Sequence, residues 1–191
     1  LPAPGSLGRK PRLLVLGYAR HGKDTVAEQL SKEYGLRFVS SSAFCAEHVV
    51  YPAVQKMWSD RWTTGVIPDV PRYETVQECF EDRGHHRKLW FDLITAYNTP
   101  NLSRLGLEIF SKYDVYCGLR NADELKALKA LGAYDAAIWV DASKRQAVEA
   151  SASCTVEPSM ADYVLNNNGR EDELPDRVRS LMAKVLADLG A

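Results

Sequence analysis

The feature that most constrains this chain is the segment GYARHGKDT at residues 17–25, because of what flanks it on both sides. The apolar run RLLVLG at residues 12–17 leads into it and ends in glycine, as expected of a strand buried on both faces of a parallel sheet. Directly after it, Val26, Ala27 and Leu30 fall on one face of a helix. A buried strand, a glycine-containing loop and a helix in this order predict a loop that binds phosphate.

The loop follows the pattern G-x-x-x-x-G-K-[ST] at Gly17, Gly22 and Lys23, but it departs from the pattern at the last position. Where a Ser or Thr hydroxyl should face Mg²⁺ the chain has Asp24, and Thr25 comes one residue later. The segment is therefore either a chance match or the loop of a kinase that holds its metal ion in a different way.

Within the loop, backbone N–H groups from Ala19 through Arg20 and His21 to Lys23 are expected to surround a β-phosphate. The helix that begins near Lys23 adds the positive end of its dipole, and the Lys23 ammonium would reach the β- and γ-phosphate oxygens. Two interpretations of Asp24 stay open. One is a helix-start carboxylate stabilised by the dipole; the other, a carboxylate that faces a metal ion, is implied by the resemblance to a kinase family described below.

With 191 residues, of which 46% are hydrophobic, the chain can bury one sizeable core, and we expect a single domain with a helical elaboration. Its formal net charge of -1 gives no general attraction to nucleic acid, so a polyanion would have to meet a local basic patch. No apolar run reaches membrane-spanning length, and residues 1–11 lack the apolar centre of a signal peptide. The spacing of the cysteines and histidines predicts reduced cytosolic thiols and no structural metal.

Apolar segments that end in turn residues alternate with helical patterns along the chain. The expected strands are 12–17, 36–40, 114–118, 136–141 and 162–167, and the expected helices include 121–132 and 174–189. This alternation predicts right-handed crossovers and a parallel sheet. The predicted fold class is α/β, a P-loop NTPase fold with a five-stranded parallel sheet flanked by helices and carrying a helical insertion.

The interval between the second and third strands is too long for a simple crossover, and we expect a helical insertion at about residues 41–112 within one P-loop kinase domain over residues 1–191. Helical patterns cover 41–58, 73–80, 85–98 and 101–113, and residues 60–73 are expected to be a mobile or ligand-contacting loop. Ligands of such folds bind beyond the carboxyl ends of the strands. The insertion would therefore wall an acceptor site.

The insertion carries a charged cluster in the segment CFEDRGHHRKLWFDL. On a helix, Asp82 and His86 would be four residues apart, as would Arg83 and Arg87, so a carboxylate–imidazole face and an arginine pair could project into one cleft. Arginine grips phosphate with two parallel hydrogen bonds, which a clamp on an acceptor phosphate needs. The alternative is a solvated charged turn, which Gly84 favours.

Two further cationic groups follow predicted strands. Arg120 stands beyond the third strand, where it could steady a transferring phosphate, or cap the sheet edge, or pair with Glu124. Lys144 and Arg145, in the segment 141–151 after the fourth strand, could form a short lid over ATP.

Six segments together resemble a bacteriophage kinase family in the thymidylate-kinase-like group. They are GYARHGKDTVAE, FCAEHVVYPA, ECFEDR-x-HHR-x-LW, VYCGLRN, AAIWVDASKR and ADYVLNNNG, and the resemblance runs from about Arg12 to Gly169. Members of this family are deoxynucleoside monophosphate kinases or 5-hydroxymethyluridine DNA kinases. The resemblance implies ATP and Mg²⁺ as cofactors, a metal held at Asp24 or Thr25, and an adenine near the loop that contains Asn167.

The residue types and the resemblance together give a set of candidate site residues. Catalytic roles are expected for Lys23, Asp82, Arg83 and Arg120, and acceptor contacts for Arg87 and Trp90. Cofactor contacts are expected for Gly17, Ala19, Arg20, His21, Gly22, Lys23, Asp24, Thr25, Arg145 and Asn167.

The acceptor is chosen on chemistry. A nucleotide phosphate mainly needs cations to hold it, whereas a hydroxymethyl group gains from a carboxylate base, and the chain offers Glu81 and Asp82. We therefore expect phosphate transfer to 5-hydroxymethyluridine in phage DNA, in the cytoplasm of an infected cell. The alternatives are a kinase of free deoxynucleoside monophosphates, a small-metabolite kinase and an ATP-binding regulatory module without an acceptor.

A DNA acceptor would need a local basic and aromatic patch to bind the strand. The insertion offers Arg61, Arg72, Arg83, Arg87 and Lys88 interleaved with Trp58, Trp62, Tyr73 and Trp90. The alternative for these aromatic residues is that they form the core of the insertion.

Overall fold

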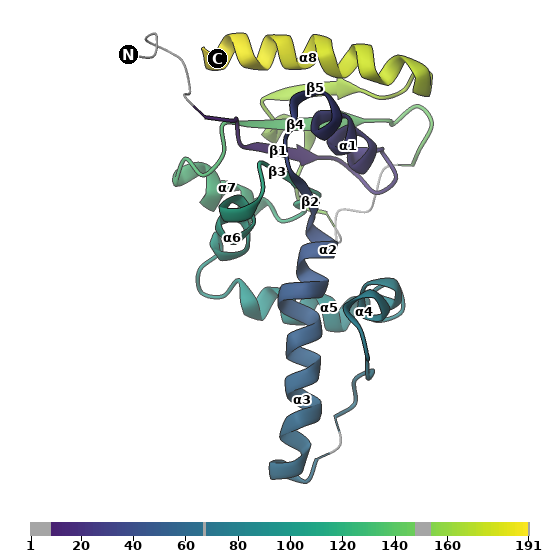
Figure 1. Ribbon diagram of the computed structural model, residues 1–191, viewed down its shortest axis with the longest axis vertical. Helices are drawn as coiled ribbons and strands as arrows, with labels where there is room; N and C mark the ends of the chain where they lie inside the picture. Colours follow the sequence, from purple (N-terminus) through teal and green to yellow (C-terminus); the bar gives the residue numbers. More distant parts are fainter. Residues whose placement is uncertain (1–8, 67, 148–153, 191) are drawn as a thin grey trace. The chain divides into compact units, whose positions relative to one another are not determined.

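The computed structural model describes residues 9–66, 68–147 and 154–190 (Figure 1). The chain divides into two compact units. The sheet unit contains the residues through Ser40 and those from Gly106 onward, and the helical unit is Ser41–Leu105.

The sheet unit is built on a parallel sheet that has five strands within the described residues, in the order β2-β3-β1-β4-β5. Its strands are β1 (Leu13–Leu16), β2 (Phe38–Ser40), β3 (Val115–Cys117), β4 (Ala136–Asp141) and β5 (Tyr163–Asn166). Its helices are α1 (Lys23–Tyr34), α7 (Ala122–Ala130) and α8 (Leu174–Leu189), with the larger part of α6 (Arg104–Lys112). The predicted five-stranded parallel sheet is confirmed, and each predicted strand lies within two residues of the observed one.

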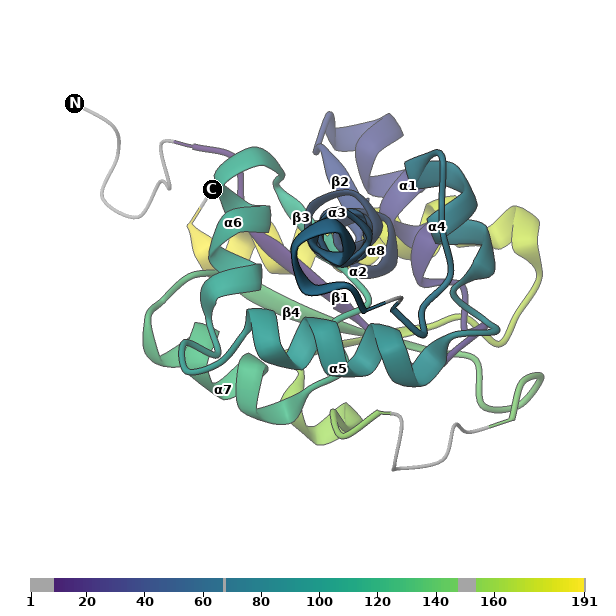
Figure 2. The same ribbon diagram turned by 90° about the horizontal axis from the view of Figure 1, so that it is seen from below.

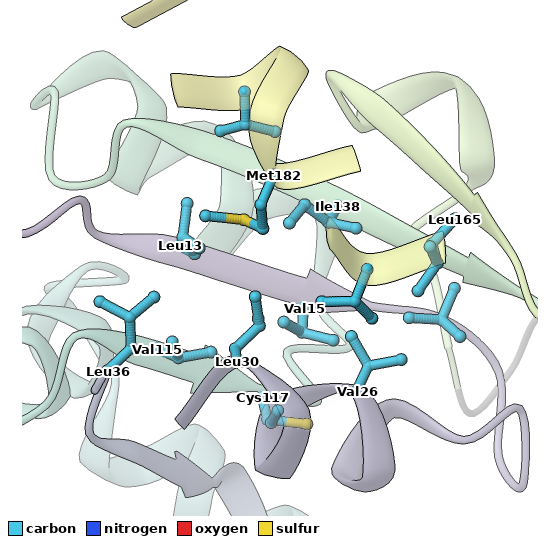
Figure 3. Packing of buried hydrophobic residues seen from close by; sticks show 14 of the residues in the cluster. Leu13, Val15, Val26, Leu30, Leu36, Val115, Cys117, Ile138, Leu165 and Met182 are labelled. Atoms are coloured by element: carbon cyan, nitrogen blue, oxygen red, sulfur yellow. The ribbon is translucent and has the colours of Figure 1, made fainter. Parts of the chain in front are cut away.

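One face of the sheet packs against α1 and α8. Leu13 and Val15 of β1 and Ile138 of β4 are fully buried there, and Figure 3 shows them among side chains of both helices, with Met182 of α8 at the centre. Alternate residues of the same strands face the other way because side chains of a strand point to opposite faces in turn.

The opposite face packs against α6 and α7, which lie side by side (Figure 1, Figure 2). Tyr116 of β3 is buried there, and its ring meets Phe110 of α6 edge to face at a centroid distance of 6.2 Å. Gly106 allows close approach of the two helices, since a Cβ at this position would overlap Leu128 of α7. With both faces covered, the central strands are apolar throughout, which is why they read as continuous apolar runs.

The helical unit contains α2 (Ser41–Cys45), a π-helical turn at Ala46–Val50, α3 (Tyr51–Thr64), α4 (Val76–Asp82) and α5 (Arg87–Tyr97). Pro52 stands at the start of α3 and has no backbone N–H, so regular α-helical bonding cannot continue through it. The π-helical turn precedes this proline, as is common where the bonding ladder is interrupted.

The helical unit differs from the expectation at two places. The predicted loop 60–73 begins later, because α3 continues to Thr64 and stops at Gly65, whose φ of 68° ends the helix; Ile67 of this loop lies outside the described residues. No helix joins Asp82 to Arg87, because α4 ends at Asp82 and a turn through Gly84 follows. The extent of the insertion, expected at about residues 41–112, stays a prediction; the compact helical unit is Ser41–Leu105.

Among the described residues, no helix combines the length and the apolar character needed to cross a membrane.

Candidate phosphate-binding site

The sheet unit gathers its polar loops at one edge, where the carboxyl ends of parallel strands lie together. The strand order places β1 between β3 and β4, so the chain moves from β1 to one side for β2 and β3 and to the other side for β4 and β5. Ligands of open α/β sheets bind beyond the strands at such a reversal point. The loop after β1 occupies this position.

Two glycines of that loop have no room for a side chain. Gly17 has a φ of 145°, and a Cβ there would lie 2.7 Å from the backbone carbonyl oxygen of Val140. Gly22 has a φ of 87°, and a Cβ there would overlap the Asn167 side-chain amide. Arg20 has a φ of 63°, which is uncommon for a residue other than glycine. Both motif glycines are thus required by the backbone geometry.

The first turn of α1 is not closed by a side chain. Its N-cap is Gly22, and no side-chain cap bond is found among the described residues. By contrast, Asn121 caps α7 by accepting hydrogen bonds from the backbone N–H groups of Asp123 and Glu124, and Thr75 caps α4 by accepting one from Glu78. An open helix start in a glycine loop directs N–H groups and a positive dipole end at one point, which suits an anion.

Lys23 and His21 add two nitrogen donors to the loop. The Lys23 ammonium donates to the Tyr18 carbonyl oxygen at 2.6 Å, so its charge lies over the loop. His21 is fully buried, and its Nδ1 accepts a hydrogen bond from the Ala142 N–H at 3.0 Å. The ring proton therefore belongs on Nε2, which is buried without a hydrogen-bond partner in the described structure. An orphaned donor inside a loop of N–H groups fits a phosphate ligand.

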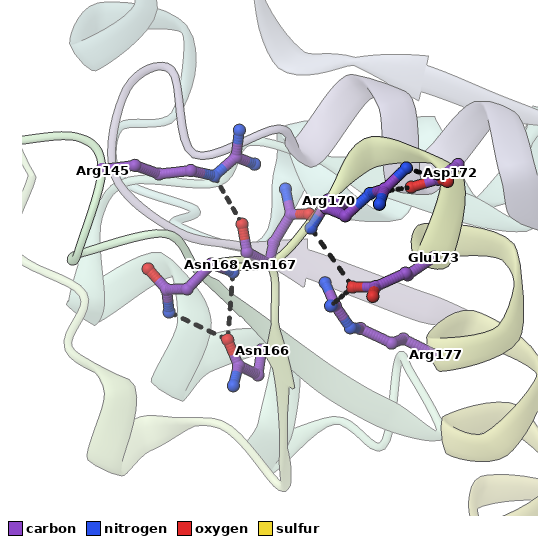
Figure 4. Close-up of polar contacts among 8 residues, drawn as sticks. All are labelled: Arg145, Asn166, Asn167, Asn168, Arg170, Asp172, Glu173 and Arg177. Atoms are coloured by element: carbon purple, nitrogen blue, oxygen red, sulfur yellow. Dashed lines mark hydrogen bonds and ion pairs between the residues drawn. The ribbon is translucent and has the colours of Figure 1, made fainter.

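The loops after β4 and β5 are joined to the phosphate-binding loop by hydrogen bonds. Asn167 is buried, and its side-chain amide donates to the His21 carbonyl oxygen at 2.9 Å. Arg145 donates from Nε to the Asn167 carbonyl oxygen at 2.6 Å, as Figure 4 shows, and Asn168 donates to Asp141 at 3.0 Å. The Asn167 side chain is thus bound to the loop, so its effect on a cofactor would be indirect. The predicted lid extends into residues 148–151, which lie outside the described residues.

Asp24 and Thr25, the candidate metal ligands, are both exposed in the first turn of α1. The Asp24 carboxylate accepts a hydrogen bond from the Cys117 thiol at the end of β3, with 3.4 Å between Sγ and Oδ1. Burial, together with the nearby Asp24 charge, raises the pKa of the Cys117 thiol well above its usual value. Cys117 is therefore a protonated donor near neutral pH.

The described residues fit a magnesium–nucleotide ligand better than a bare metal ion. No group of three His, Cys, Asp or Glu side chains in the described part of the chain could hold a metal. Mg²⁺ at phosphate sites keeps several waters and takes one or two protein oxygens plus phosphate oxygens. The exposed oxygens of Asp24 and Thr25, beside a cradle that has no room for side chains, meet that demand.

Arg120 is exposed after β3, as its predicted position beyond the strand requires. Its backbone carbonyl oxygen accepts hydrogen bonds from Thr155 and Val156, which fixes the loop. Glu124, the alternative partner of Arg120, is buried and accepts a hydrogen bond from the Tyr116 hydroxyl at 3.0 Å. Burial raises the pKa of Glu124 to about 7, while the Tyr116 bond acts in the opposite direction.

In the helical unit, Asp82 is the centre of a polar cluster. Its carboxylate accepts from the Tyr73 hydroxyl at 3.0 Å and lies 2.9 Å from His85 Nδ1 and 3.2 Å from His86 Nε2. Burial acts to raise the pKa of Asp82, but hydrogen bonds from Tyr73 and His85 and the nearby imidazoles bring it below its usual value. The predicted carboxylate–imidazole pairing is present, although a turn rather than a helix produces it.

Asp82 is a weaker base than we expected because three groups share its two oxygens. His85 is a second candidate proton acceptor in the cluster, because its Nδ1 is held by Asp82 and its ring is 83% exposed. Sequence reasoning missed this residue, although its spacing to Asp82 in a turn was visible. Arg83 donates to the Phe80 carbonyl oxygen at 2.7 Å and stacks on that ring, so it does not share a helical face with Arg87.

The predicted aromatic patch separates into two kinds of residue. Tyr73 and Trp90 are buried, with Trp90 6% exposed, so both belong to the core of the helical unit. Trp58 is half-buried and donates to the Pro71 carbonyl oxygen at 3.0 Å. Trp62 is 79% exposed, and the Arg61 guanidinium carbon lies over its ring, 4.6 Å from the ring centroid. A contact of Trp90 with an acceptor stays a prediction, and its observed role is packing.

The strand order and the loop together define an α/β protein with the P-loop NTPase fold. No protein-family model matches this sequence, and no curated protein matches it either.

Several solved structures are similar to this chain over most of their length. A shikimate kinase from Aquifex aeolicus has a TM-score of 0.45 at 15% identity, with 93% of this chain and 97% of that chain covered. A gluconokinase from Sinorhizobium meliloti has a TM-score of 0.47 at 13% identity, with 94% and 95% covered. A sugar kinase from Janibacter has a TM-score of 0.43 at 17% identity, with 96% and 99% covered. Similarities this distant leave the substrate of this chain open.

Proposed function

We propose that this protein is an ATP-dependent kinase that uses Mg²⁺. The observation that carries the proposal is the loop after β1, where two glycines without room for a side chain lead into an uncapped helix start that carries Lys23. This combination sits at the reversal point of a parallel sheet, the place where such folds hold phosphates. Among the other helices, α4 and α7 have side-chain caps from Thr75 and Asn121, whereas α5 and α8 have none, so the uncapped start of α1 counts only together with the glycine loop and Lys23.

When bound, magnesium ATP supplies the phosphoryl group and screens its charge. The backbone N–H groups of the loop and the α1 dipole would hold the β-phosphate, and the Lys23 ammonium would leave the Tyr18 carbonyl oxygen to meet developing negative charge. Arg120 and Arg145 follow strands that end at the same sheet edge as the loop, so their guanidinium groups are candidates to steady the phosphates.

For the acceptor, the proposal is the hydroxymethyl group of 5-hydroxymethyluridine in phage DNA, which places the protein in the cytoplasm of an infected cell. The support is chemical: a hydroxyl must lose its proton, and the Asp82–His85 pair is built to accept one, with Asp82 orienting the imidazole. Trp62 with Arg61 offers an exposed ring and a cation of the kind that stacks on bases. The helical unit would then be the acceptor-binding insertion of a single kinase domain.

The test uses γ-labelled ATP with four acceptors: an oligonucleotide that contains 5-hydroxymethyluridine, the matching thymine oligonucleotide, free dTMP and free dGMP. Label on the hydroxymethyl oligonucleotide alone is the expected result. Single-stranded substrate should react at least as well as duplex, because extruding a base costs a few kcal/mol.

Each other outcome assigns a different function. Label on free mononucleotides with none on DNA would identify a deoxynucleoside monophosphate kinase. Label on neither, with ATP bound and no acceptor-dependent release of ADP, would favour the regulatory module over a kinase of these acceptors. Failure to bind ATP at all would overturn the proposal.

A further inference from the structure

The contact between Asp24 and Cys117 reverses the usual distribution of groups around a nucleotide-bound magnesium ion. In P-loop NTPases the loop supplies a hydroxyl and a neighbouring strand supplies a carboxylate. Here the loop position carries the carboxylate, Asp24, and the end of the neighbouring strand β3 carries a small donor, Cys117. The two side chains meet at 3.4 Å between Sγ and Oδ1.

The strand partner of the pair is held rigidly. Cys117 is fully buried, and β3 pairs with strands on both sides, so that Cys117 lies opposite Val15 of β1 and Ser40 of β2. Gly118 follows with a backbone hydrogen bond of 2.9 Å to the Val15 carbonyl oxygen. A thiol in this position has little freedom and can orient a carboxylate that reaches it from another element.

The helix partner of the pair is exposed and can reach a ligand. Asp24 stands in the first turn of α1, directly after Lys23, and its second carboxylate oxygen, Oδ2, is not the atom that meets Cys117. The hydrogen bond from the thiol therefore restrains the carboxylate through Oδ1, which is one of its two oxygens. Orientation of a ligating carboxylate by a hydrogen-bonded neighbour is how metal sites hold their ligands in place.

We propose that Asp24 and Cys117 form an exchanged pair, in which Asp24 supplies the protein carboxylate for the nucleotide-bound Mg²⁺ and Cys117 positions it from β3. The proposal rests on the proposed function, because it assumes that the loop binds magnesium nucleotide. It assigns the metal role to Asp24 rather than to Thr25, and it explains why the loop departs from the usual Ser or Thr. A carboxylate that merely stabilises the start of α1 would need no partner on β3.

The experiment measures Mn²⁺ binding to the whole protein in the presence of ADP, by the electron paramagnetic resonance signal of free Mn²⁺. Asp24→Asn keeps the shape and the hydrogen-bond acceptor but removes the charge, and should weaken Mn²⁺ binding by at least about tenfold. Cys117→Ala removes the positioning bond and should weaken it by about 10- to 100-fold, while Cys117→Ser, which keeps a donor, should stay near the wild type.

The decisive variant restores the usual arrangement, with a hydroxyl on the loop and a carboxylate on the neighbouring strand. Asp24→Ser alone should lose Mn²⁺ affinity, and the double variant Asp24→Ser with Cys117→Asp should recover most of it. Asp123→Asn, which removes a matched first-turn carboxylate from α7, is the control and should bind Mn²⁺ as the wild type does. Wild-type Mn²⁺ affinity in Asp24→Asn, or no recovery in a folded double variant, would overturn the proposal.

Two further measurements keep the outcomes separate. Circular dichroism identifies a variant that fails to fold; if the double variant does so, the decision rests on Asp24→Asn and on Cys117→Ala against Cys117→Ser. ADP binding without metal, measured in EDTA, should be retained in every folded variant. If the wild type itself binds no ADP, the proposed function fails, whereas ADP binding with Mn²⁺ affinity unchanged by Asp24→Asn overturns only the exchanged pair.

Discussion

The sheet unit and the helical unit hold their polar groups in different ways. In the sheet unit, the phosphate-binding loop is fixed by backbone geometry and by hydrogen bonds from two other loops, through the Ala142 N–H and the buried Asn167 side chain. In the helical unit, the Asp82 cluster depends on side chains around one exposed turn. A site built from backbone leaves a readable sequence pattern, whereas a site built from a turn does not.

The largest expected effect tests whether the loop of the sheet unit carries the chemistry. Lys23→Ala should lower phosphate transfer by on the order of 10³-fold or more, because it removes a charge from the transferring phosphate. Circular dichroism should be unchanged, since the ammonium contacts a loop carbonyl and not the core. Lys56→Ala, which removes an exposed lysine of α3 paired with Asp60, is the control and should keep the wild-type rate. Near-normal turnover in Lys23→Ala would contradict the site assignment.

The two units also contain carboxyl groups whose pKa values shift in opposite directions: the pKa of Glu124 is raised and the pKa of Asp82 is lowered. Burial raises the pKa of Glu124 in the sheet unit to about 7, so between pH 4.5 and about 7 the folded protein holds a proton that the unfolded chain releases. The stability that this carboxyl group contributes is full below that range and is lost as the pH rises through about 7, by about 3 kcal/mol in all.

Glu124→Gln should remove that loss and be more stable than the wild type at pH 8, with little difference at pH 4. Urea unfolding of both proteins at the two pH values measures the effect. A parallel pH dependence in the two proteins would mean that the Glu124 carboxyl group is not buried as described.

The next prediction asks whether the helical unit takes part in catalysis. Asp82→Asn should lower transfer to the hydroxyl acceptor by about 10²-fold, because the imidazole of His85 loses the carboxylate that orients it. Affinity for ATP, measured by calorimetry, should stay nearly unchanged. His86→Asn offers a comparison within the cluster, since His86 is less exposed than His85. Equal rates for the wild type and Asp82→Asn would show that the Asp82 cluster does not supply the general base.

The smallest expected effect compares one glycine from each unit. Gly17→Ala should cost about 2 kcal/mol of stability, because of its positive φ and the 2.7 Å approach to the Val140 carbonyl oxygen. Gly65→Ala, at the end of α3, has a positive φ but nothing within 4 Å, and should cost about 1 kcal/mol. Urea unfolding of the two variants gives the difference. Equal costs would show that the backbone of the loop is not tightly packed.

The sequence predicted the sheet unit well because its signals are local. Gly17 and Gly22 are each required by a positive φ and a close neighbour, and the strands are apolar because both faces of the sheet are covered. The contact of Asp24 with Cys117 could not be predicted, since it joins residues far apart in the chain through the register of β3.

The helical unit was predicted less well. The helices were found, but the turn at Gly84 decides where Arg83 and Arg87 lie, and helical spacing through that turn was wrong. Exposure was also beyond the sequence, which cannot distinguish the buried Trp90 from the exposed Trp62. The residue type is the same at both positions, and only the packing of the folded chain determines which side chain is buried.

The central claim is that the loop at residues 17–25 holds the phosphates of a nucleotide, and calorimetric titration of the whole protein tests it most directly. With Mg²⁺ present, ATP should bind saturably at one site per chain, and adenosine, which lacks the phosphates, should bind at least about 100-fold more weakly, because the loop donors and the α1 dipole act on anions. Equal affinity for ATP and adenosine, or no heat of binding with ATP, would contradict the account.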